Sequence, residues 1–484
     1  MTINDLKPKL LWHYFDELTQ IPRPSKHEEL VVKYLADFAI KHNLEYQQDE
    51  AGNTVIRKGA TLGLEDMETI VLQSHVDMVC EKNTDVKHDF MKDPIQTYVD
   101  GNWLRTKGTT LGADNGIGVA IELAILASND IEHGPIECLF TTDEETGLTG
   151  ASALAKNWNL IKGRTLINLD SEDEGEVYIG CAGGCGTVAF LNNETESIPE
   201  GRFLGLDISV RGLKGGHSGG DIHLGRGNAI KIAARLSKML SDECQFRICH
   251  FSGGNIHNAI PREAHIVGFV PFEYREKCRV ELNVFAAQIE EELHGVDDDL
   301  EIFMETTDLP DMVLSQDIQN KLISILIAAP HGVIRMSHDI EGLVETSSNL
   351  ASVKSTDDNR IRIETSQRSS YKSQIQYTTE MINALFSLAG AEVQNRDGYP
   401  GWTPNMKSPI LQKSVATYKA LFGKEPLIKA IHAGLECGLF YERDNAMDMI
   451  SIGPTIREVH SPDECVDIDS VGKFWTYITT LLKV

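Results

Sequence analysis

The chain has 484 residues, more than one hydrophobic core supports, so at least two domains are expected. Asp and Glu total 72 against 45 Lys and Arg, and the formal net charge of −27 argues against a nucleic-acid-binding or anionic membrane surface. The N-terminal stretch carries acidic residues where a signal peptide needs an apolar segment, and no later run approaches a membrane span. The nine scattered cysteines match neither a disulfide framework nor a paired zinc motif, so we expect reduced thiols in a soluble cytoplasmic protein.

The first elements in chain order are helical and lead to a buried strand. Residues 10–42 have helical periodicity, interrupted where Pro22 and Pro24 force an extended turn. The stretch "ETIVLQSHVDMV", residues 68–79, then has the short apolar run of a strand buried on both faces, followed directly by His75 and Asp77. Taken alone, such a His is more often a hydrogen-bonded surface residue than a metal ligand, so this motif needs support from elsewhere in the chain.

Three further segments place polar side chains at the ends of regular elements. "TTLGADNGIGVAIELAILASND", residues 109–130, is a Gly-rich turn that runs into a helix, with Asp114 placed to cap that helix. "IECLFTT" is an apolar strand that leads into the pair Glu144-Glu145, and "TLINLD" is another strand that ends in Asp170. Strands that alternate with helices predict βαβ units and a mostly parallel sheet.

Near residue 197 the pattern changes to strands that alternate apolar and polar residues, as in "RFLGLDISVRG", which is typical of a half-exposed antiparallel sheet. "RIRIETS" and the helix "SQDIQNKLISILIAA" continue this α+β character, and after "GYPGWTPN" the βα pattern returns with the buried strand "MDMISIGP". We therefore expect an α/β fold with a mostly parallel central sheet. Its two parts, residues 1–196 and 391–484, are interrupted by an inserted α+β domain, residues 197–390.

The polar residues at the strand ends are expected at one edge of the sheet, because functional groups gather outside the carboxyl ends of parallel strands. "GPTIREVHSPDE" adds a histidine to that edge. Two imidazoles and three carboxylates result as candidate metal ligands: His75, Asp114, one glutamate of the pair Glu144-Glu145, Asp170 and His460. Such mixed nitrogen and oxygen donors match a pair of divalent ions, Zn²⁺ or else Mn²⁺ or Co²⁺, with one carboxylate shared between them.

This ligand set predicts hydrolytic chemistry. Two metal ions about 3.5 to 4 Å apart can hold a water between them as hydroxide and polarise a substrate carbonyl. The Glu144-Glu145 pair supplies one ligand and leaves the other glutamate as a general base, and its place at the sheet edge argues against the alternative of a solvated acidic loop. Asp77 can accept a hydrogen bond from the distal nitrogen of His75 and so orient the ring, with a simple strand-end cap as the alternative.

The same motifs resemble a known family. "SHVDMV", "GTTLGADNGIG", "TTDEETG", "GLKGGHSGG", "NAIPREA", "HAGLECGLF" and "SIGPTIREVHSPDE" together closely resemble the aminoacyl-histidine dipeptidase (Xaa-His dipeptidase, peptidase D) family of the di-zinc exopeptidase clan. The likeness runs nearly end to end. It implies a zinc-exopeptidase-like catalytic domain and makes the inserted domain a lid.

The resemblance implies how the ligands divide between two metal ions. By position in the motifs, Asp114 bridges the two ions. His75 and Asp170 complete the first ion, and Glu145 and His460 complete the second.

The resemblance also implies roles for the residues around the metals. Glu144 matches the general base of the family, and Asp77 matches the residue that orients the histidine ligand. The Asp114-Asn115 bond matches a position that is usually a cis peptide. An aspartate at position 170 accompanies dipeptidases and aminopeptidases in the clan, so Asp170 favours a substrate with a free amino terminus.

In the inserted domain the resemblance implies residues that contact the substrate. His217 matches a histidine that helps to stabilise the oxyanion, in some relatives across a dimer, so a homodimer is implied as well. Asn258 and Arg368 match positions that contact substrate, Arg368 as a fork for the peptide carboxylate, with a surface ion pair as the alternative. In "HAGLECG", Gly434 and Glu436 match a substrate-binding loop.

Together these residues predict metal-dependent hydrolysis of dipeptides, of Xaa-His type with a free amino terminus, with Glu144 as general base. A small peptide is the expected substrate, and neither nucleic acid nor membrane is an expected partner. A tripeptide aminopeptidase and an N-acyl amino acid amidohydrolase of the same clan are the alternatives. A non-catalytic metal- or peptide-binding protein would be a different class, and the intact Glu144-Glu145 pair argues against it because a binding protein needs no base.

Overall fold

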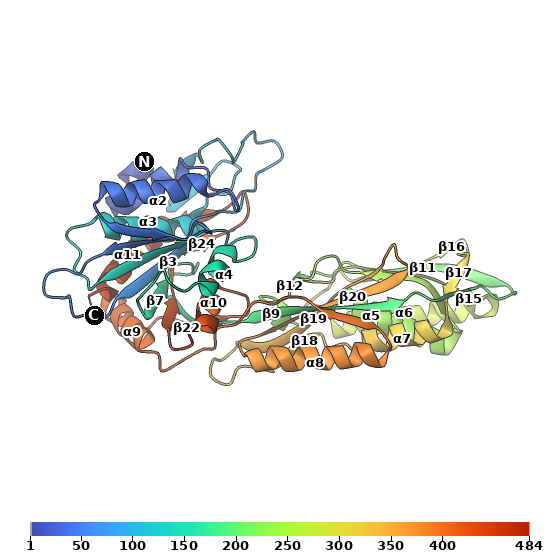
Figure 1. Cartoon of the computed structure of the whole chain (residues 1–484). Coiled ribbons are helices and arrows are strands. Elements are labelled where there is room, and N and C mark those ends of the chain that lie inside the picture. Colours follow the sequence, from blue (N-terminus) through green and yellow to red (C-terminus); the bar gives the residue numbers. More distant parts are fainter. Residues whose placement is uncertain (1, 484) are drawn as a thin grey trace. The chain divides into compact units, whose positions relative to one another are not determined.

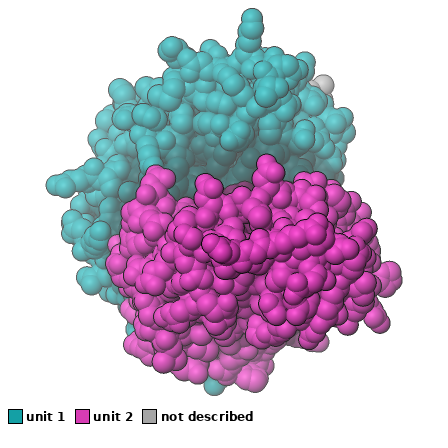
Figure 2. All heavy atoms as spheres, turned by 90° about the vertical axis from the view of Figure 1, so that its right-hand side faces the viewer, with its two compact units in different colours: residues 1–181, 402–430, 435–484 teal, residues 182–401, 431–434 magenta. Residues whose placement is uncertain are grey.

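The computed structural model describes residues 2–483, which form two compact units (Figure 2). Among the described residues, unit 1 comprises residues 2–181, 402–430 and 435–483, and unit 2 comprises residues 182–401 and 431–434. The chain therefore enters unit 2 twice, once through a long insertion and once through a short segment. The division into a catalytic domain and a lid with boundaries at 197 and 390 stays a prediction.

The sheet of unit 1 has eight strands in the order β1-β2-β6-β3-β7-β23-β8-β22. Of these, β3, β7 and β22 are labelled in Figure 1. In chain order these are β1 (Glu45–Gln48), β2 (Thr54–Lys58), β3 (Ile70–His75), β6 (Ile136–Thr141), β7 (Thr165–Asn168), β8 (Glu176–Cys181), β22 (Leu427–Ile431) and β23 (Asp448–Ser451). β6, β3, β7 and β23 run parallel to one another, and the antiparallel strands β2 and β8 flank them. β3 and β6 are buried at every position, as the apolar runs of the sequence predict.

Helices pack against this sheet. Those of unit 1 are α1 (Lys9–Thr19), α2 (Glu29–Lys41), α3 (Ala113–Ala127), α4 (Thr149–Lys156), α9 (Pro409–Phe422), α10 (Glu436–Arg443) and α11 (Ile468–Leu481), with a 3₁₀ turn at Ile3–Asp5. α3 packs against β3, and α9 packs against β23. A smaller sheet has the order β24-β25-β5-β4, formed by β24 (Ile456–Arg457), β25 (Cys465–Asp467), β5 (Trp103–Thr106) and β4 (Thr97–Asp100). Among residues 2–483, no helix has the length and apolar character that crossing a bilayer requires.

The start of α3 differs from the sequence prediction. Gly112, with φ of 68°, is the N-cap of this helix, so the expectation that Asp114 caps it is wrong. Asp114 and Asn115 have non-helical backbone angles, and the peptide bond between them is cis, as the family resemblance implies. The first N–H groups of the turn donate instead to the carboxylate of Glu464, which leaves the side chain of Asp114 available at the sheet edge.

Unit 2 contains a nine-stranded antiparallel sheet in the order β16-β11-β15-β13-β19-β20-β9-β21, with β18 paired to β19. Its strands are β9 (Gly183–Asn192), β11 (Phe203–Arg211), β13 (Arg247–Gly253), β15 (Ala264–Pro271), β16 (Glu301–Thr307), β18 (Gly332–Met336), β19 (Val344–Ser355), β20 (Arg360–Ser369) and β21 (Glu392–Asn395). Two short pairs join β10 (Thr195–Ser197) to β17 (Met312–Leu314) and β12 (Gly216–His217) to β14 (Ala259–Ile260). This is the antiparallel character that the period-two pattern predicts.

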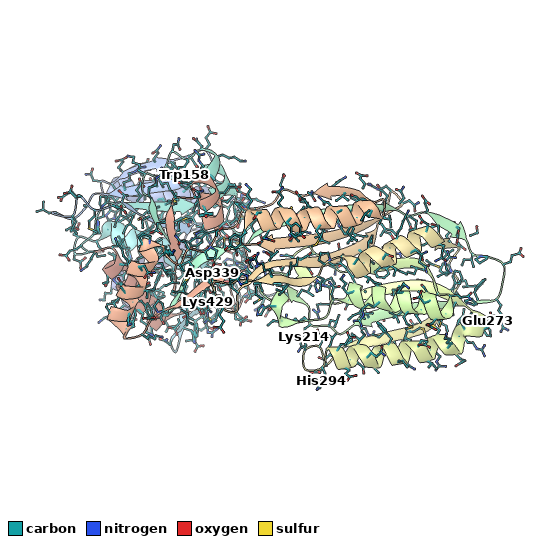
Figure 3. All side chains as sticks on the ribbon, turned by 90° about the horizontal axis from the view of Figure 1, so that it is seen from below. Trp158, Lys214, Glu273, His294, Asp339 and Lys429 are labelled. Carbon is teal, nitrogen blue, oxygen red and sulfur yellow. The ribbon has the colours of Figure 1, made fainter. Side chains whose placement is uncertain are left out.

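The helices of unit 2 cover one face of its sheet. α5 (Ala229–Cys244), α6 (Arg275–Glu292), α7 (Gln316–Ala328) and α8 (Lys372–Leu388) lie side by side there (Figure 3). Short 3₁₀ turns lie at Ile222–Leu224 and Phe272–Tyr274. Leu206, Ile208 and Val210 of β11 are buried in the core that forms with these helices, and the polar residues between them are not, so the predicted alternation of β11 is confirmed.

Candidate active site

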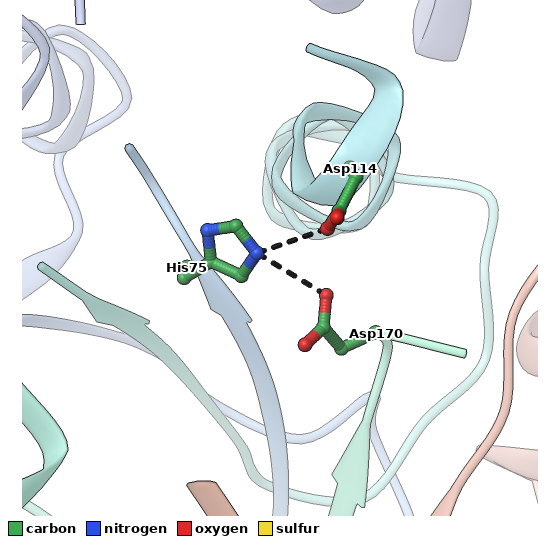
Figure 4. Close-up of side chains that lie close together, drawn as sticks. All are labelled: His75, Asp114 and Asp170. Atoms are coloured by element: carbon green, nitrogen blue, oxygen red, sulfur yellow. Dashed lines mark hydrogen bonds and ion pairs between the residues drawn. The ribbon is translucent and has the colours of Figure 1, made fainter. Parts of the chain in front are cut away.

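The first polar cluster lies at the carboxyl end of β3. His75 is the last residue of this fully buried strand, so its ring is fixed in place, and the side chain is 1 % exposed. On one side of the ring, Nδ1 lies 3.3 Å from Oδ1 of Asp77. On the other side, Nε2 lies 3.0 Å from Oδ1 of Asp114 and 3.3 Å from Oδ1 of Asp170 (Figure 4). One imidazole nitrogen therefore faces two carboxylates, one from the start of α3 and one from the end of β7.

The second polar cluster shares Asp114 with the first. His460, in the loop after β24, has its Nε2 3.2 Å from Oδ2 of Asp114 and 3.0 Å from Oε2 of Glu145. Its φ of 60° is a left-handed backbone conformation, which turns the ring toward these carboxylates. The two oxygens of Asp114 thus face two different histidines, the arrangement that a bridging carboxylate requires.

Divalent cations fit this set of donors. The ligand atoms of His75, Asp114 and Asp170 lie within 4.8 Å of one another, and so do those of Asp114, Glu145 and His460. Oε1 of Glu145 is buried without a hydrogen-bond partner among the described residues. Buried carboxylate oxygens without donors are costly, and cations that coordinate them would remove that cost. Nitrogen and oxygen donors in this number are the preference of Zn²⁺ and similar ions.

Asp77 organises the segment that carries the glutamate pair. Its carboxylate accepts hydrogen bonds from the backbone N–H of Glu144 (3.1 Å) and Glu145 (3.3 Å) and from Oγ of Ser25 (2.7 Å). Burial opposes ionisation of Asp77, but the contact with His75 and these donors outweigh it and lower its pKa to about 2. Asp77 therefore stays ionised while it faces His75 and holds the glutamate backbone.

The side chain of Glu144 has a different electrostatic setting. Burial raises its pKa well above the ordinary value, and the negative charges of Asp170 and Glu436 act in the same direction against the opposing effect of His75. A carboxylate whose pKa is raised binds a proton more readily, which suits a group that accepts and returns a proton. Glu144 also lies close enough to His75 and Glu145 to be a further ligand candidate, so geometry alone leaves both roles available to it.

A buried polar network that the sequence analysis missed lies below the cluster. Nε2 of Gln73 donates to Oε2 of Glu436 (2.6 Å), and Oε1 of Gln73 accepts from Nδ2 of Asn168 (2.7 Å). Oδ1 of Asn168 in turn accepts from the hydroxyl of Ser451. The network crosses β3, β7 and β23 next to their carboxyl ends, so it fixes how these ends align. The available signal was the presence of polar residues next to the apolar runs of these buried strands.

Glu436, which the sequence analysis associates with substrate, is 1 % exposed and belongs to this network. Burial raises its pKa to about 7, partly offset by His75 and by hydrogen bonds from Thr141 and Gln73. The contacts of Oε2 therefore lie in the sheet of unit 1, where Thr141 ends β6.

The three candidates of the inserted domain, His217, Asn258 and Arg368, lie in unit 2, and so does Gly434, which was expected in the second part of the catalytic domain. His217, in β12, accepts at Nδ1 from the N–H of Gly220 (3.0 Å), and its Nε2 lies 3.5 Å from Nη2 of Arg368. Arg368, in β20, is 7 % exposed and donates through Nη1 to the hydroxyl of Tyr399 (2.6 Å). Its Nε is buried without a partner among the described residues. The alternative of a surface ion pair for Arg368 is therefore wrong.

Asn258 and Gly434 lie beside these residues. The carbonyl of Asn258 accepts a hydrogen bond of 2.8 Å from the N–H of Ser218, the residue that follows His217. A Cβ at Gly434 would lie 2.7 Å from Cε2 of Tyr399, so only glycine fits against that ring without a shift. The structure thus gathers His217, Arg368 and Tyr399, and the sequence analysis missed Tyr399 because nothing near it in the chain marks it.

Comparison with known proteins places this arrangement in a family. The sequence profile of peptidase family M20/M25/M40 matches residues 71–483. The chain is 44% identical to the cytosol non-specific dipeptidase of Escherichia coli over 481 residues, which are 99% of this chain and 98% of the relative. The crystal structure of aminoacylhistidine dipeptidase from Vibrio alginolyticus has a TM-score of 0.92 and 44% identity, and the match covers 100% of this chain and 98% of that one. A tripeptidase from Staphylococcus aureus, 16% identical, shares the fold with a TM-score of 0.56 over 99% of this chain and 98% of its own.

These matches confirm the resemblance to aminoacyl-histidine dipeptidases and the α/β fold with an inserted α+β part. They also confirm the expectation that the chain is a peptidase. The profile match covers most of the chain, and the relatives match it nearly end to end. The chain belongs to peptidase family M20/M25/M40.

Proposed function

We propose that the chain is a two-metal exopeptidase that hydrolyses dipeptides with a free amino terminus. The observation that carries this proposal is Asp114, whose two oxygens face His75 at 3.0 Å and His460 at 3.2 Å. A shared carboxylate between two separate imidazole and carboxylate clusters is the arrangement of a two-metal hydrolase. The names of the E. coli and V. alginolyticus relatives support the restriction to dipeptides.

In the proposed site, His75 and Asp170 would hold one metal ion, Glu145 and His460 would hold the other, and Asp114 would be a ligand of both. When bound, two divalent ions, which we propose to be Zn²⁺, with Mn²⁺ or Co²⁺ as alternatives, supply Lewis-acid activation of water and of the scissile carbonyl. The side chains of the protein transfer the proton and bind the substrate.

Glu144 is the proposed general base. Its carboxylate accepts a proton from the attacking water and then returns that proton to the nitrogen of the leaving amine. The raised pKa of Glu144 supports this role, because burial favours the protonated form that the carboxyl group adopts after it has accepted the proton. Asp77 holds the backbone N–H groups of Glu144 and Glu145, so the base and one ligand move together.

Residues of unit 2 are proposed to bind the rest of the substrate. Arg368, with a buried Nε that has no partner among the described residues, is suited to a peptide carboxylate, because a guanidinium binds carboxylates through two parallel hydrogen bonds. We assign oxyanion stabilisation to His217 and substrate contacts to Asn258 and Gly434. Three further parts complete the proposal. The name of the V. alginolyticus relative supports a preference for Xaa-His dipeptides, and that of the E. coli relative supports a cytoplasmic location. The homodimeric state is supported by the family resemblance alone.

The test uses chelator-stripped protein, assayed before and after Zn²⁺, Mn²⁺ or Co²⁺ is returned. The substrates are Xaa-His dipeptides, other dipeptides, tripeptides and N-acetyl amino acids. We expect metal-restored cleavage of dipeptides and no cleavage of N-acetyl compounds. Preferred cleavage of tripeptides or N-acyl substrates would move the chain to a tripeptide aminopeptidase or an amidohydrolase. Metal binding without hydrolysis of any substrate would leave a metal- or peptide-binding protein.

A further inference from the structure

The turn that carries Asp114 is held from two sides by buried side chains of opposite charge. Glu464 lies on the N–H side of this turn, and Arg23 lies on its carbonyl side. Both side chains are almost fully buried, at 2 % and 3 % exposed. Neither residue is among the proposed metal ligands.

Glu464 accepts hydrogen bonds from four consecutive backbone N–H groups. Oε2 accepts from Leu111 (2.7 Å) and Gly112 (3.0 Å), and Oε1 accepts from Ala113 (2.7 Å) and Asp114 (3.4 Å). The carboxylate thus caps the N-terminus of α3 from a distant part of the chain, where a negative charge is favoured. Glu464 lies four residues after His460 in the same loop, so a single side chain ties the loop of His460 to the backbone of Asp114.

Arg23 ties the same turn to the end of β3. Its Nη2 donates to the carbonyl of Gly112 (2.6 Å), and its Nη1 donates to the carbonyls of Val76 and Asp77, both at 2.9 Å. The approach is close, because a Cβ at Gly112 would lie 2.5 Å from Nη2 of Arg23. Three segments that carry proposed ligands, the end of β3, the turn before α3 and the loop of His460, are therefore joined by two charged side chains.

We propose that Glu464, assisted by Arg23, is a positioning residue that sets the place of Asp114 between the two metal ions. This inference rests on the proposed two-metal site. A bridging carboxylate must satisfy the geometry of both ions at once, so a shift of its backbone weakens both sites together. Groups that orient ligands in this way typically change metal affinity by about 10- to 100-fold when they are removed.

The test is the variant Glu464→Gln, compared with Glu137→Gln as a matched control. In the Gln variant one side-chain oxygen becomes an NH₂ group, which faces two N–H donors of the turn and cannot accept from them. Glu137 is also 2 % exposed, and its Oε2 accepts from two backbone N–H groups, those of Lys162 (2.7 Å) and Gly163 (2.9 Å). It lies near the start of β6, at the opposite end of the strand from the proposed site.

Chelator-stripped wild-type protein and both variants would be titrated with Zn²⁺ by calorimetry, with bound metal counted by elemental analysis. Thermal unfolding of the metal-free proteins would be followed in parallel. We expect both variants to unfold at lower temperature than wild type. Only Glu464→Gln should bind Zn²⁺ about 10- to 100-fold more weakly. Wild-type affinity in Glu464→Gln, or an equal loss in Glu137→Gln, would overturn the positioning role.

A second variant keeps the test decisive if Glu464→Gln does not fold. Glu464→Asp retains the negative charge but is one methylene shorter, so it reaches the N–H groups less well. We expect folded protein with Zn²⁺ affinity between those of wild type and Glu464→Gln, and wild-type affinity would count against the proposal. A wild-type chain that binds two Zn²⁺ ions and cleaves no peptide would refute the dipeptidase function and leave the positioning role intact.

Discussion

The two residues of the pair Glu144-Glu145 have different proposed roles, one as general base and the other as metal ligand. Replacing Glu144 with Gln removes the proposed base but keeps the volume of the side chain. The backbone N–H groups of both residues remain bound to Asp77 at 3.1 and 3.3 Å, so the substitution leaves the segment in place. Replacing Glu145 with Gln instead removes an oxygen that lies 3.0 Å from Nε2 of His460 and that is proposed to hold a metal ion.

The expected effects differ in kind and in size. Loss of a general base typically lowers the rate by about 10²- to 10⁴-fold. That factor corresponds to about 3–5 kcal/mol of transition-state stabilisation. Glu144→Gln should therefore lower kcat by this factor and keep KM and the content of two metal ions. After the metal has been stripped and returned, Glu145→Gln should hold one metal ion fewer than wild type, because a buried ligand oxygen has been replaced.

The assay measures dipeptide hydrolysis and metal content on the same preparations. Steady-state kinetics give kcat and KM, and elemental analysis gives the number of ions per chain. The role of Glu144 as base is refuted if Glu144→Gln keeps near-full turnover with both ions bound. If Glu144→Gln loses an ion, the residue is a ligand, which its proximity to His75 and Glu145 also allows.

Three further outcomes follow from the structure. Arg368→Gln should raise KM for dipeptides about tenfold or more, since charge-assisted hydrogen bonds of this kind contribute about 1.5–3 kcal/mol. The variant should cleave carboxyl-amidated dipeptides as well as wild type does. Equal losses on both substrates would refute carboxylate binding. Asp77→Asn should weaken Zn²⁺ affinity by about 10- to 100-fold in a calorimetric titration, because the amide cannot accept at both positions; unchanged affinity would contradict its orienting role. Burial, with the nearby charge of Lys231, lowers the pKa of His331 from 6.5 to about 4. Between pH 6.5 and pH 4 this histidine is therefore protonated in the unfolded chain but neutral in the folded one. As a result, the free energy of unfolding falls as pH drops from 6.5 toward 4. The contribution is about 3 kcal/mol, and His331→Gln should remove that part of the pH dependence in urea unfolding at pH 7.5 and 4.5; an unchanged slope would count against it.

The strand ends could be predicted from sequence because their signal is local. A short apolar run with His75 or Asp170 shortly after it marks both the strand and its functional end. Gln73 and Glu436 could not be paired in this way, because their hydrogen bond joins residues 363 positions apart. The wrong cap of α3 has the same origin. Asp114 has the sequence position of a cap, but Glu464, 350 positions away, supplies the carboxylate that accepts from the first N–H groups of the helix. No local sequence pattern predicts that Glu464 takes this role.

The candidates in unit 2 had weaker local signals. Arg368 lies in a strand that reads as half-exposed, whereas the structure buries it against Tyr399. A charged residue inside a strand is usually directed to solvent, so its burial depends on tertiary partners that periodicity does not reveal. The position of Gly434 against the Tyr399 ring is likewise a tertiary fact.

The place of β23 in the sheet also constrains how this protein comes into being. β23 (Asp448–Ser451) lies between β7 and β8, although it is made long after both of them. While the ribosome is still producing the insertion, the edge of β7 that will pair with β23 has unpaired N–H and C=O groups. Such open edges are prone to pair with strands of other chains. His460 emerges later still. The central sheet can therefore close only after residues 448–451 have been made, and the proposed metal site can form only after His460 has followed them.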